Sequence, residues 1–286
     1  MANETEATAL AVLTQELWRP QILSYQYNAM KIGKRVLNVT GDVAAKGDIL
    51  HIPIEPSITV GAVTAATGAI SNQAWTPTEA QLTVDKWDHA TVDVVDMAQR
   101  QAIGDVLAQI RPGMGKAAAA DIDEKLAALF VAGLTTNEVG SKAAPYDSVN
   151  PDILTSAIQK LLDLTIALED PNLVSFFFHT SVWSQLKKIA EFNNANLTGK
   201  AVGGAIEMKI PDIYGVPVYF STTIDSSSGV YKNALCHKEC IGWGMQKNFN
   251  IETLARVRKS TPYSADWLFG VKVVRETYGC LINTIA

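Results

Sequence analysis

The chain has 286 residues, of which 48% are apolar and 19% charged, a composition that provides for a buried core and excludes a low-complexity or disordered chain. Its 24 basic and 29 acidic residues give a net charge of −5, without the basic excess typical of proteins that bind nucleic acid over much of their surface. Three cysteines make no disulfide framework, and we expect neither a secretory signal nor a membrane span, because no basic apolar leader and no run of about 18 apolar residues occurs.

Residues 1–45 predict an amphipathic arm. Apolar side chains recur at loosely helical spacing from Leu10 to Ile22, with Trp18 among them, and the segment then becomes basic as far as Arg35. An arm that reaches a neighbouring molecule and an ordinary first helix packed on its own domain explain this pattern equally well.

The next segment predicts a long hairpin. Ile49–Ile54 reads as a strand, and alternation of apolar and polar residues resumes at Leu82 and continues to Val94. Residues 57–80 between these legs are rich in Ser, Thr, Ala and Gly, with Trp75 near the end. Such a hairpin cannot stabilise itself in water, so we expect it to pack on a partner; a disordered loop is the alternative.

Helical spacing of apolar residues predicts one long helix over residues 97–133. Asp96 is available as its N-cap and Gly133 as its C-terminal stop. A helix of this length spans about 55 Å at ~1.5 Å per residue. Because proline removes a backbone donor, Pro112 predicts a kink or two abutting helices.

A second, α/β layer is expected from Asn150–Pro151, which is a typical helix start, to the Ser/Gly turn that ends near residue 228. It contains a buried strand over residues 173–179. Four further strands are predicted after it, and we expect them to pair with the strands near residues 49–54 and 90–95, which makes the second layer an insertion. These four are Ala234–Cys236, Ile251–Val257, Val271–Val274 and Tyr278–Ile282.

Two groups of side chains in the sequence bear on possible chemistry. Cys236, His237 and Cys240 have side chains that can bind zinc or iron, but the paired spacings of a structural metal site are missing, and buried thiols are the favoured interpretation. The acidic residues around Asp121 and Asp123 read as a solvated helix face. No nucleotide-binding loop or catalytic triad is present.

The densest basic group consists of Arg256, Arg258 and Lys259. Nearby aromatic residues make single-strand binding conceivable, yet no recognisable arrangement for it occurs. Ion pairs within the subunit or between subunits are the favoured interpretation.

The order of these elements resembles that of the major capsid proteins of tailed double-stranded DNA bacteriophages over essentially the whole chain. The stretches that carry the resemblance are Gly47–Pro53, Thr76–Trp87, Val94–Gln99, Phe176–Trp183, Ile213–Val218 and His237–Gly242. The resemblance implies an α+β, HK97-like capsid fold with an N-terminal arm, an extended hairpin loop, a long spine helix, and an α/β axial domain inserted in a peripheral domain.

The implied domains are residues 1–45 for the arm, 46–149 for the first part of the peripheral domain, 150–228 for the axial domain and 229–286 for the peripheral return strands. Within the first part, the extended loop covers 55–80 and the spine helix 97–133. Contacts between subunits are expected at Trp18, Thr64, Thr67, Trp75, Thr76, Arg256, Arg258 and Lys259.

The function implied is structural, with no catalytic, metal or cofactor site. Copies of the chain would form hexamers and pentamers of an icosahedral shell, assembled in the cytoplasm of a host bacterium and present in the virion. The expected partners are a separate scaffolding protein, since no scaffolding extension precedes the arm, a portal, a decoration protein and packaged double-stranded DNA bound without sequence specificity. The alternatives are an encapsulin-type nanocompartment shell and, further away, a soluble metalloenzyme that uses the Cys236/His237/Cys240 cluster.

Overall fold

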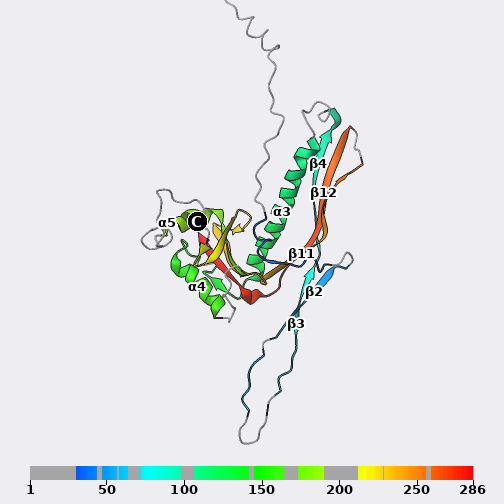
Figure 1. Ribbon diagram of the computed structural model, residues 1–286. Coiled ribbons are helices and arrows are strands. Elements are labelled where there is room, and N and C mark those ends of the chain that lie inside the picture. Colours follow the sequence, from blue (N-terminus) through cyan, green and yellow to red (C-terminus); the bar gives the residue numbers. More distant parts are fainter. Residues whose placement is uncertain are drawn as a thin grey trace, which may run out of the picture.

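The computed structural model describes most of the chain after its N-terminal segment. The described residues are 30–43, 47–56, 58–63, 70, 72–97, 106–141, 145–163, 173–189, 212–227, 229–255 and 259–285. Within them the strands form a four-stranded sheet, a larger sheet and a separate two-stranded ribbon. Figure 1 shows a long sheet and helix on one side, a more rounded α/β part on the other, and the ribbon projecting between them.

The four-stranded sheet joins segments that are far apart in the sequence. Its order is β1-β11-β12-β4, with β12 antiparallel to both neighbours and β1 parallel to β11. The strands are β1 (Leu37–Asn38), β4 (Lys86–Val95), β11 (Ile241–Thr253) and β12 (Ser260–Val273). A strand of the C-terminal part therefore pairs with the segment at 90–95, as expected, but the paired residues 260–265 lie between the expected strands Ile251–Val257 and Val271–Val274.

Helix α3 (Val106–Gly133) lies along one face of this sheet (Figure 1). It buries Met114, Ala118, Ile122, Leu126 and Phe130, which recur every four residues and so share one side of the helix. The helix runs without a break through Pro112, so the expected division into two abutting helices is wrong. The proline is exposed near the beginning of the helix, where water can compensate for the missing backbone donor. Residues 98–105 lie outside the described part.

The hairpin is confirmed, but its second leg is shorter than expected. β2 (Ile49–Ile54) pairs antiparallel with β3 (Thr78–Thr83), and a break at residues 84–85 separates β3 from β4. The alternation from Leu82 to Val94 thus spans two strands in two different sheets. Because the described partner of β2 is β3, the expected pairing of a return strand with residues 49–54 is wrong.

The larger sheet has the order β5-β13-β10-β6-β8-β7, with β9 paired to β10. Its central strands β10 and β6 are antiparallel, and β6 is parallel to β8. The strands are β5 (Glu138–Val139), β6 (Val174–His179), β7 (Asp212–Ile213), β8 (Val216–Ser221), β9 (Ser226–Ser227), β10 (Val230–His237) and β13 (Gly279–Ile285). The domain boundary at residue 228 stays a prediction, and strand pairing crosses it between β9 and β10.

Short helices accompany the larger sheet. They are α4 (Pro151–Leu162), α5 (Trp183–Lys188) and the 3-10 turns η2 (Thr180–Val182) and η3 (Glu276–Tyr278). Helix α4 begins as the sequence predicts, because the side chain of Asn150 accepts a hydrogen bond of 2.9 Å from the backbone N–H of Ile153. None of the helices in the described ranges is long and apolar enough to cross a membrane.

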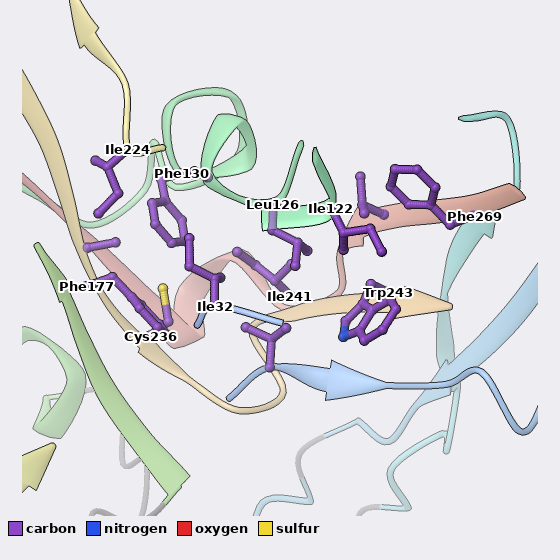
Figure 2. Close-up of a cluster of buried hydrophobic side chains, with 14 of the residues drawn as sticks. Ile32, Ile122, Leu126, Phe130, Phe177, Ile224, Cys236, Ile241, Trp243 and Phe269 are labelled. Atoms are coloured by element: carbon purple, nitrogen blue, oxygen red, sulfur yellow. The ribbon is translucent and has the colours of Figure 1, made fainter. Parts of the chain in front are cut away.

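Two main apolar cores hold these layers together. One lies between α3 and the four-stranded sheet and reaches Phe177 and Cys236 of the larger sheet (Figure 2). The other lies between the larger sheet and α4, and includes Leu154, Phe176 and Phe178. Since Phe176 and Phe178 face one core and Phe177 faces the other, β6 is buried on both sides and connects the two parts of the molecule.

The described end of the N-terminal segment packs on its own subunit. Ile32 is fully buried in the core with residues of α3 and with Trp243 (Figure 2). The Nε1 of Trp243 donates a hydrogen bond of 2.9 Å to the carbonyl of Gly33. The guanidinium of Arg35 lies 4.9 Å from the centre of the Tyr219 ring. Residues 30–43 therefore fit the alternative of a segment packed on its own domain, while residues 1–29 lie outside the described part.

Candidate assembly surfaces

The ribbon of β2 and β3, with the segment that continues it, carries several of the most exposed apolar side chains among the described residues. It projects away from both sheets, and its continuation reaches far from the body of the molecule (Figure 1). Ile58 is 71% exposed, Ile70 73% and Trp75 64%. Sequence reasoning singled out Trp75 and passed over the isoleucines, because they are scattered among small polar residues. An apolar surface on a projecting ribbon has no core of its own to bury it.

The base of the ribbon is fixed to the four-stranded sheet. A small apolar cluster there contains Val39, Leu82 and Val84, with Leu50 and Ile52 packed against it. Gly270 of β12 lies so close to β3 that an added Cβ atom would overlap the carbonyl of Thr83 and come within 2.8 Å of Leu82 Cδ2. The base of the ribbon is therefore packed tightly against the four-stranded sheet.

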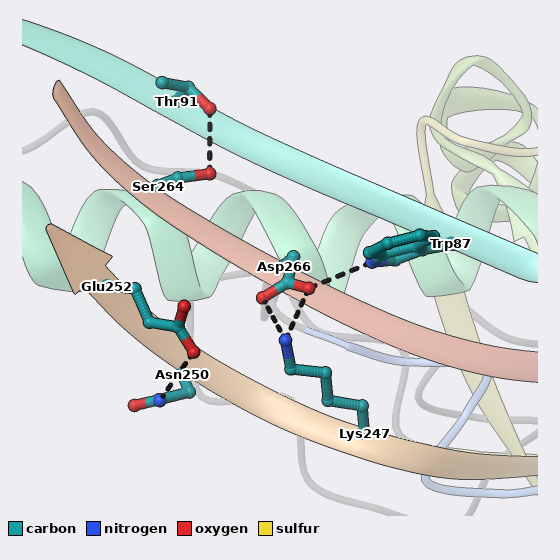
Figure 3. Close-up of polar contacts among 7 residues, drawn as sticks. All are labelled: Trp87, Thr91, Lys247, Asn250, Glu252, Ser264 and Asp266. Carbon is teal, nitrogen blue, oxygen red and sulfur yellow. Dashed lines mark hydrogen bonds and ion pairs between the residues drawn. The ribbon is translucent and has the colours of Figure 1, made fainter. Parts of the chain in front are cut away.

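The outer face of the four-stranded sheet, opposite α3, is polar. The Asp266 carboxylate accepts hydrogen bonds from Trp87 Nε1 at 2.9 Å and from Lys247 Nζ at 2.6 and 2.8 Å (Figure 3). Hydrogen bonds from Lys247 first, and from Trp87 second, lower the pKa of Asp266. On the adjoining positions Thr91 and Ser264 share a hydrogen bond of 2.9 Å. These contacts join β4, β11 and β12 on a face that remains open to a neighbour.

Lys259 lies at the far end of the same sheet from the ribbon. Its carbonyl accepts a hydrogen bond of 3.0 Å from the backbone N–H of Asp96, just after the end of β4, whereas β4 begins directly after β3. A strand of 10 residues separates the two by about 30 Å at ~3.3 Å per residue. One subunit thus has the exposed Lys259 and the apolar projection at opposite ends of β4.

The structure describes three of the residues expected to contact other subunits. Trp75, Thr76 and Lys259 are exposed; the first two are adjacent in the chain, and Lys259 lies at the far end of β4 from them. The remaining expected residues, Trp18, Thr64, Thr67, Arg256 and Arg258, lie outside the described residues.

The thiol cluster is part of the core. Cys236, Cys240 and Cys280 are buried, and burial is the main cause that raises the pKa of Cys236 far above its ordinary value and that of Cys280 to about 12. Such thiols resist the deprotonation that metal binding needs. In the part of the chain described here, no group of three or more His, Cys, Asp or Glu side chains is placed to hold a metal ion.

One acidic residue has a role that sequence reasoning missed. Asp123 is 1% exposed and accepts hydrogen bonds from the backbone N–H groups of Lys31 and Gly33, at 2.5 and 3.0 Å. The interpretation of this helix face as solvated is wrong for Asp123. Asp121 is also only partly exposed: it lies 3.9 Å from Lys125, and its Oδ2 accepts a hydrogen bond of 3.0 Å from Trp267 Nε1 of β12. No local signal distinguishes the two aspartates, because the difference comes from a segment about 90 residues away.

Taken together, the projecting ribbon with its uncovered apolar side chains and the open polar sheet face leave large surfaces available for contact with other molecules. The chain belongs to the phage capsid protein family, whose model matches residues 77–283. It is a structural protein of a phage capsid shell with an HK97-like fold, and the family match does not favour the encapsulin or metalloenzyme alternatives.

Solved structures agree with this assignment. The chain is similar to a structure titled Mycobacterium phage Che8, with a TM-score of 0.76, 20% identity, and coverage of 94% of this chain and 96% of that one. The capsid of cyanophage P-SCSP1u matches with a TM-score of 0.76 at 14% identity, covering 96% and 94%. The capsid of a native GTA particle matches with a TM-score of 0.73 at 11% identity, covering both chains completely. No curated protein sequence matches.

Proposed function

We propose that this chain is the repeating subunit of an icosahedral shell, arranged as hexamers and pentamers, and that its ribbon is a principal contact between neighbouring copies. The observation that supports this is the exposure of Ile58, Ile70 and Trp75 on a projection that its own subunit does not cover. Covering them with a neighbour removes apolar surface from water, which contributes about 25 cal/mol per Å².

Symmetry makes such a contact effective. In a closed ring each subunit both extends its ribbon and receives that of the next copy, so one pair of complementary surfaces is used as many times as there are subunits. We propose that the basic corner at Arg256, Arg258 and Lys259 and the residues Thr64, Thr67 and Thr76 take part in these contacts, and that Trp18 does so on the arm. The described separation of Lys259 from Trp75 suits contacts with different neighbours.

The other partners follow from what a capsid subunit does. We propose a separate scaffolding protein, a portal, a decoration protein and packaged double-stranded DNA as partners, with assembly in the host cytoplasm and no catalytic activity. The net charge of −5 supports DNA contact without tight or sequence-specific binding, because strong phosphate binding on the inner wall would hinder movement of the genome.

The test is expression of the full chain, followed by sedimentation velocity and negative-stain electron microscopy. Closed shells, tubes, or isolated hexamers and pentamers are the expected result. The variant Trp75→Ser should reduce assembly strongly while leaving the thermal unfolding of the subunit unchanged, because the side chain is 64% exposed.

Trp75→Phe serves as the matched control, since it keeps an aromatic surface and should restore most of the assembly. A wild-type chain that remains a monomer or dimer, even when a scaffolding protein is co-expressed, would contradict the proposal. Shells that form equally well from Trp75→Ser would leave the shell function standing and remove this residue from the interface.

A further inference from the structure

Two histidines of the larger sheet cap the ends of neighbouring strands in the same way. His179 is the last residue of β6, and His237 is the last residue of β10. His179 Nδ1 accepts a hydrogen bond of 3.1 Å from the backbone N–H of Ser181. His237 Nδ1 accepts one of 3.3 Å from the backbone N–H of Glu239. In both cases the donor lies two residues further along the chain, so each imidazole holds the turn that follows its strand.

These two hydrogen bonds require neutral rings. A ring nitrogen accepts a backbone N–H through its lone pair, so the proton of each neutral imidazole is on Nε2. A protonated imidazole carries N–H groups on both nitrogens, and its Nδ1 then presents a donor to the backbone donor. Histidine changes between these states in the range between about pH 5 and 8. Protonation within that range therefore removes both caps.

The surroundings of His179 favour the neutral ring. Its ring lies on that of Tyr231 in β10, with the ring centres 4.4 Å apart. Burial lowers the pKa of His179 from its ordinary 6.5. In the described part of the chain, the titratable group that faces the ring is the Tyr231 phenol. The cap begins the turn η2, from which α5 continues, so protonation of His179 should loosen the start of this helical segment.

His237 lies where the chain crosses from one sheet to the other. One crossover joins β10 to β11, and a second joins β12 to β13. The two are tied together, because the carbonyl of Cys240 accepts hydrogen bonds from the backbone N–H groups of Val274 and Arg275 at 2.8 and 3.1 Å. The rings of His237 and Tyr278 meet edge to face between the two crossovers, with their centres 5.3 Å apart. The His237 cap therefore lies at the junction of the two sheets.

The environment of His237 opposes its protonation overall. Burial is the main cause that lowers its pKa from the ordinary 6.5. The charge of Glu239 acts against this shift, and the charges of Arg275 and Lys238 add to it. Arg275 also lies 3.8 Å from the Glu239 carboxylate and donates a hydrogen bond of 2.7 Å to the Tyr278 hydroxyl. Because Glu239 already has a cationic partner, a protonated His237 would be a third cation at this crossover.

We propose that His179 and His237 form an acid-sensitive switch that controls how firmly the larger sheet is joined to its neighbouring elements. With neutral rings, both caps are closed and the two crossovers stay packed together. With protonated rings, the caps open, and the junction between the sheets and the start of η2 become looser. Because the unfolded chain takes up these protons at a higher pH than the folded chain, the folded state loses stability as pH falls from the ordinary 6.5 through the lowered pKa values.

The test is hydrogen exchange of the full chain at about pH 7.5 and about pH 5, measured by mass spectrometry and corrected for the intrinsic pH dependence of exchange. Peptides that contain Ser181 or Glu239 should lose protection at the lower pH. The loss should reach up to about tenfold for each unit by which folding lowers the histidine pKa. Wild-type protection that is equal at both pH values in these two turns would overturn the proposal, whatever the variants do.

Asparagine is the most informative replacement, because its Oδ1 accepts the backbone N–H two residues further on and its side chain does not titrate. The double variant with His179→Asn and His237→Asn should keep both turns protected at about pH 7.5 and should retain that protection at about pH 5. His89→Asn is the matched control, since His89 is exposed on β4, and it should show the same acid loss as wild type. An acid loss in the double variant as large as that in wild type would also overturn the proposal.

Discussion

Asp123 of α3 holds the backbone of Gly33 through a hydrogen bond of 3.0 Å between its Oδ1 and the backbone nitrogen, across 90 positions of sequence. The same carboxylate accepts from the N–H groups of Lys31 and Ile32 at 2.5 and 3.3 Å. Lys31 Nζ in turn donates to the carbonyl of Phe220. One buried carboxylate thus organises the segment that leads from the N-terminus into the first core.

Replacing Asp123 by Asn should destabilise the subunit. The asparagine amide keeps one acceptor oxygen, but its NH₂ group replaces the second oxygen. That NH₂ group faces the backbone N–H groups of residues 31–33, so at least one of these buried donors loses its acceptor. The free energy of unfolding should fall by about 1–3 kcal/mol, measured by urea denaturation of unassembled subunits. Glu124→Gln is the control on the same helix, because Glu124 is exposed and its replacement should change stability little. Equal effects of both variants would contradict the anchoring role.

This anchor also shows what the sequence could not reveal. The helix itself, its C-terminal end at Gly133 and the cap at Asn150 were predictable, because each depends on residues within a few positions. Burial of Asp123 depends on a segment 90 residues away, and nothing in the local pattern separates it from the exposed Glu124. Charged residues on a helix are normally solvated, and tertiary contacts decide the exceptions.

Asp88 and Asp121 form a pair of carboxyl groups between β4 and α3, and this pair should make stability depend on pH. Burial raises the pKa of Asp121, its hydrogen bond from Trp267 Nε1 opposes the rise, and the nearby Asp88 adds to it. Asp88 Oδ2 is buried without a hydrogen-bond partner. Between the ordinary pKa near 3.8 and the raised value, the folded state binds more protons than the unfolded state, so stability falls as pH rises.

Asp88→Asn should therefore stabilise the subunit at pH 7, by up to about 1 kcal/mol, because it removes a like charge and supplies an N–H donor. The gain should shrink as pH falls through the raised pKa of Asp121, because protonation of Asp121 removes the repulsion between the two carboxylates. Thermal unfolding over a series of pH values measures this. Asp93→Asn, at an exposed position further along β4, is the control and should give no such pH-dependent gain. If the stability gain of Asp88→Asn grew at low pH, the pairing of Asp88 with Asp121 would be refuted.

A side chain at Gly270 should disturb the packing of β3 against β12 at the base of the ribbon. An alanine Cβ there overlaps the backbone carbonyl of Thr83, and a backbone atom cannot move aside as a flexible side chain can. Gly270→Ala should lower the free energy of unfolding by about 1–3 kcal/mol. In hydrogen exchange, the amides of β3 near Thr83 should lose protection. Gly41→Ala is the control, since a Cβ at Gly41 meets no atom within 4 Å. Unchanged exchange at β3 in Gly270→Ala would contradict the close contact.

The hairpin shows how much of the structure the alternation of apolar and polar residues could predict. Alternation located β2 and the leg that begins near Leu82, because one face of each strand is buried and the other is not. It did not show that the leg divides at residues 84–85, since β3 and β4 keep the same alternation while changing sheets. Among the expected contact residues, Trp75, Thr76 and Lys259 could be predicted as exposed. Their partners could not be predicted, because those contacts belong to other copies.

Glu276 should stabilise the subunit at neutral pH and lose this effect in acid. Its Oε1 accepts hydrogen bonds from the hydroxyl groups of Thr135 and Thr136, both at 2.7 Å, and from their backbone N–H groups at 3.1 and 2.9 Å, just after the end of α3. These bonds favour the charged form, so they lower the pKa of Glu276 from its ordinary 4.5. The folded state then binds fewer protons than the unfolded state below that value. Stability present above pH 4.5 is lost as pH falls through the lowered pKa.

Glu276→Gln should consequently lower the free energy of unfolding at pH 7 by about 1 kcal/mol, because the charge-assisted hydrogen bonds become ordinary ones. The difference in unfolding free energy between Glu276→Gln and wild type should narrow as pH falls from about 5 towards 3. Glu276 thus makes the wild-type subunit less stable as pH falls, whereas Asp121 makes it less stable as pH rises. Urea denaturation at several pH values measures both. Glu239→Gln is the control, since Glu239 is exposed and lies 3.8 Å from Arg275, and its loss should be small at every pH. A difference between Glu276→Gln and wild type that stays constant over this range would show that the four hydrogen bonds do not depend on the charge of Glu276.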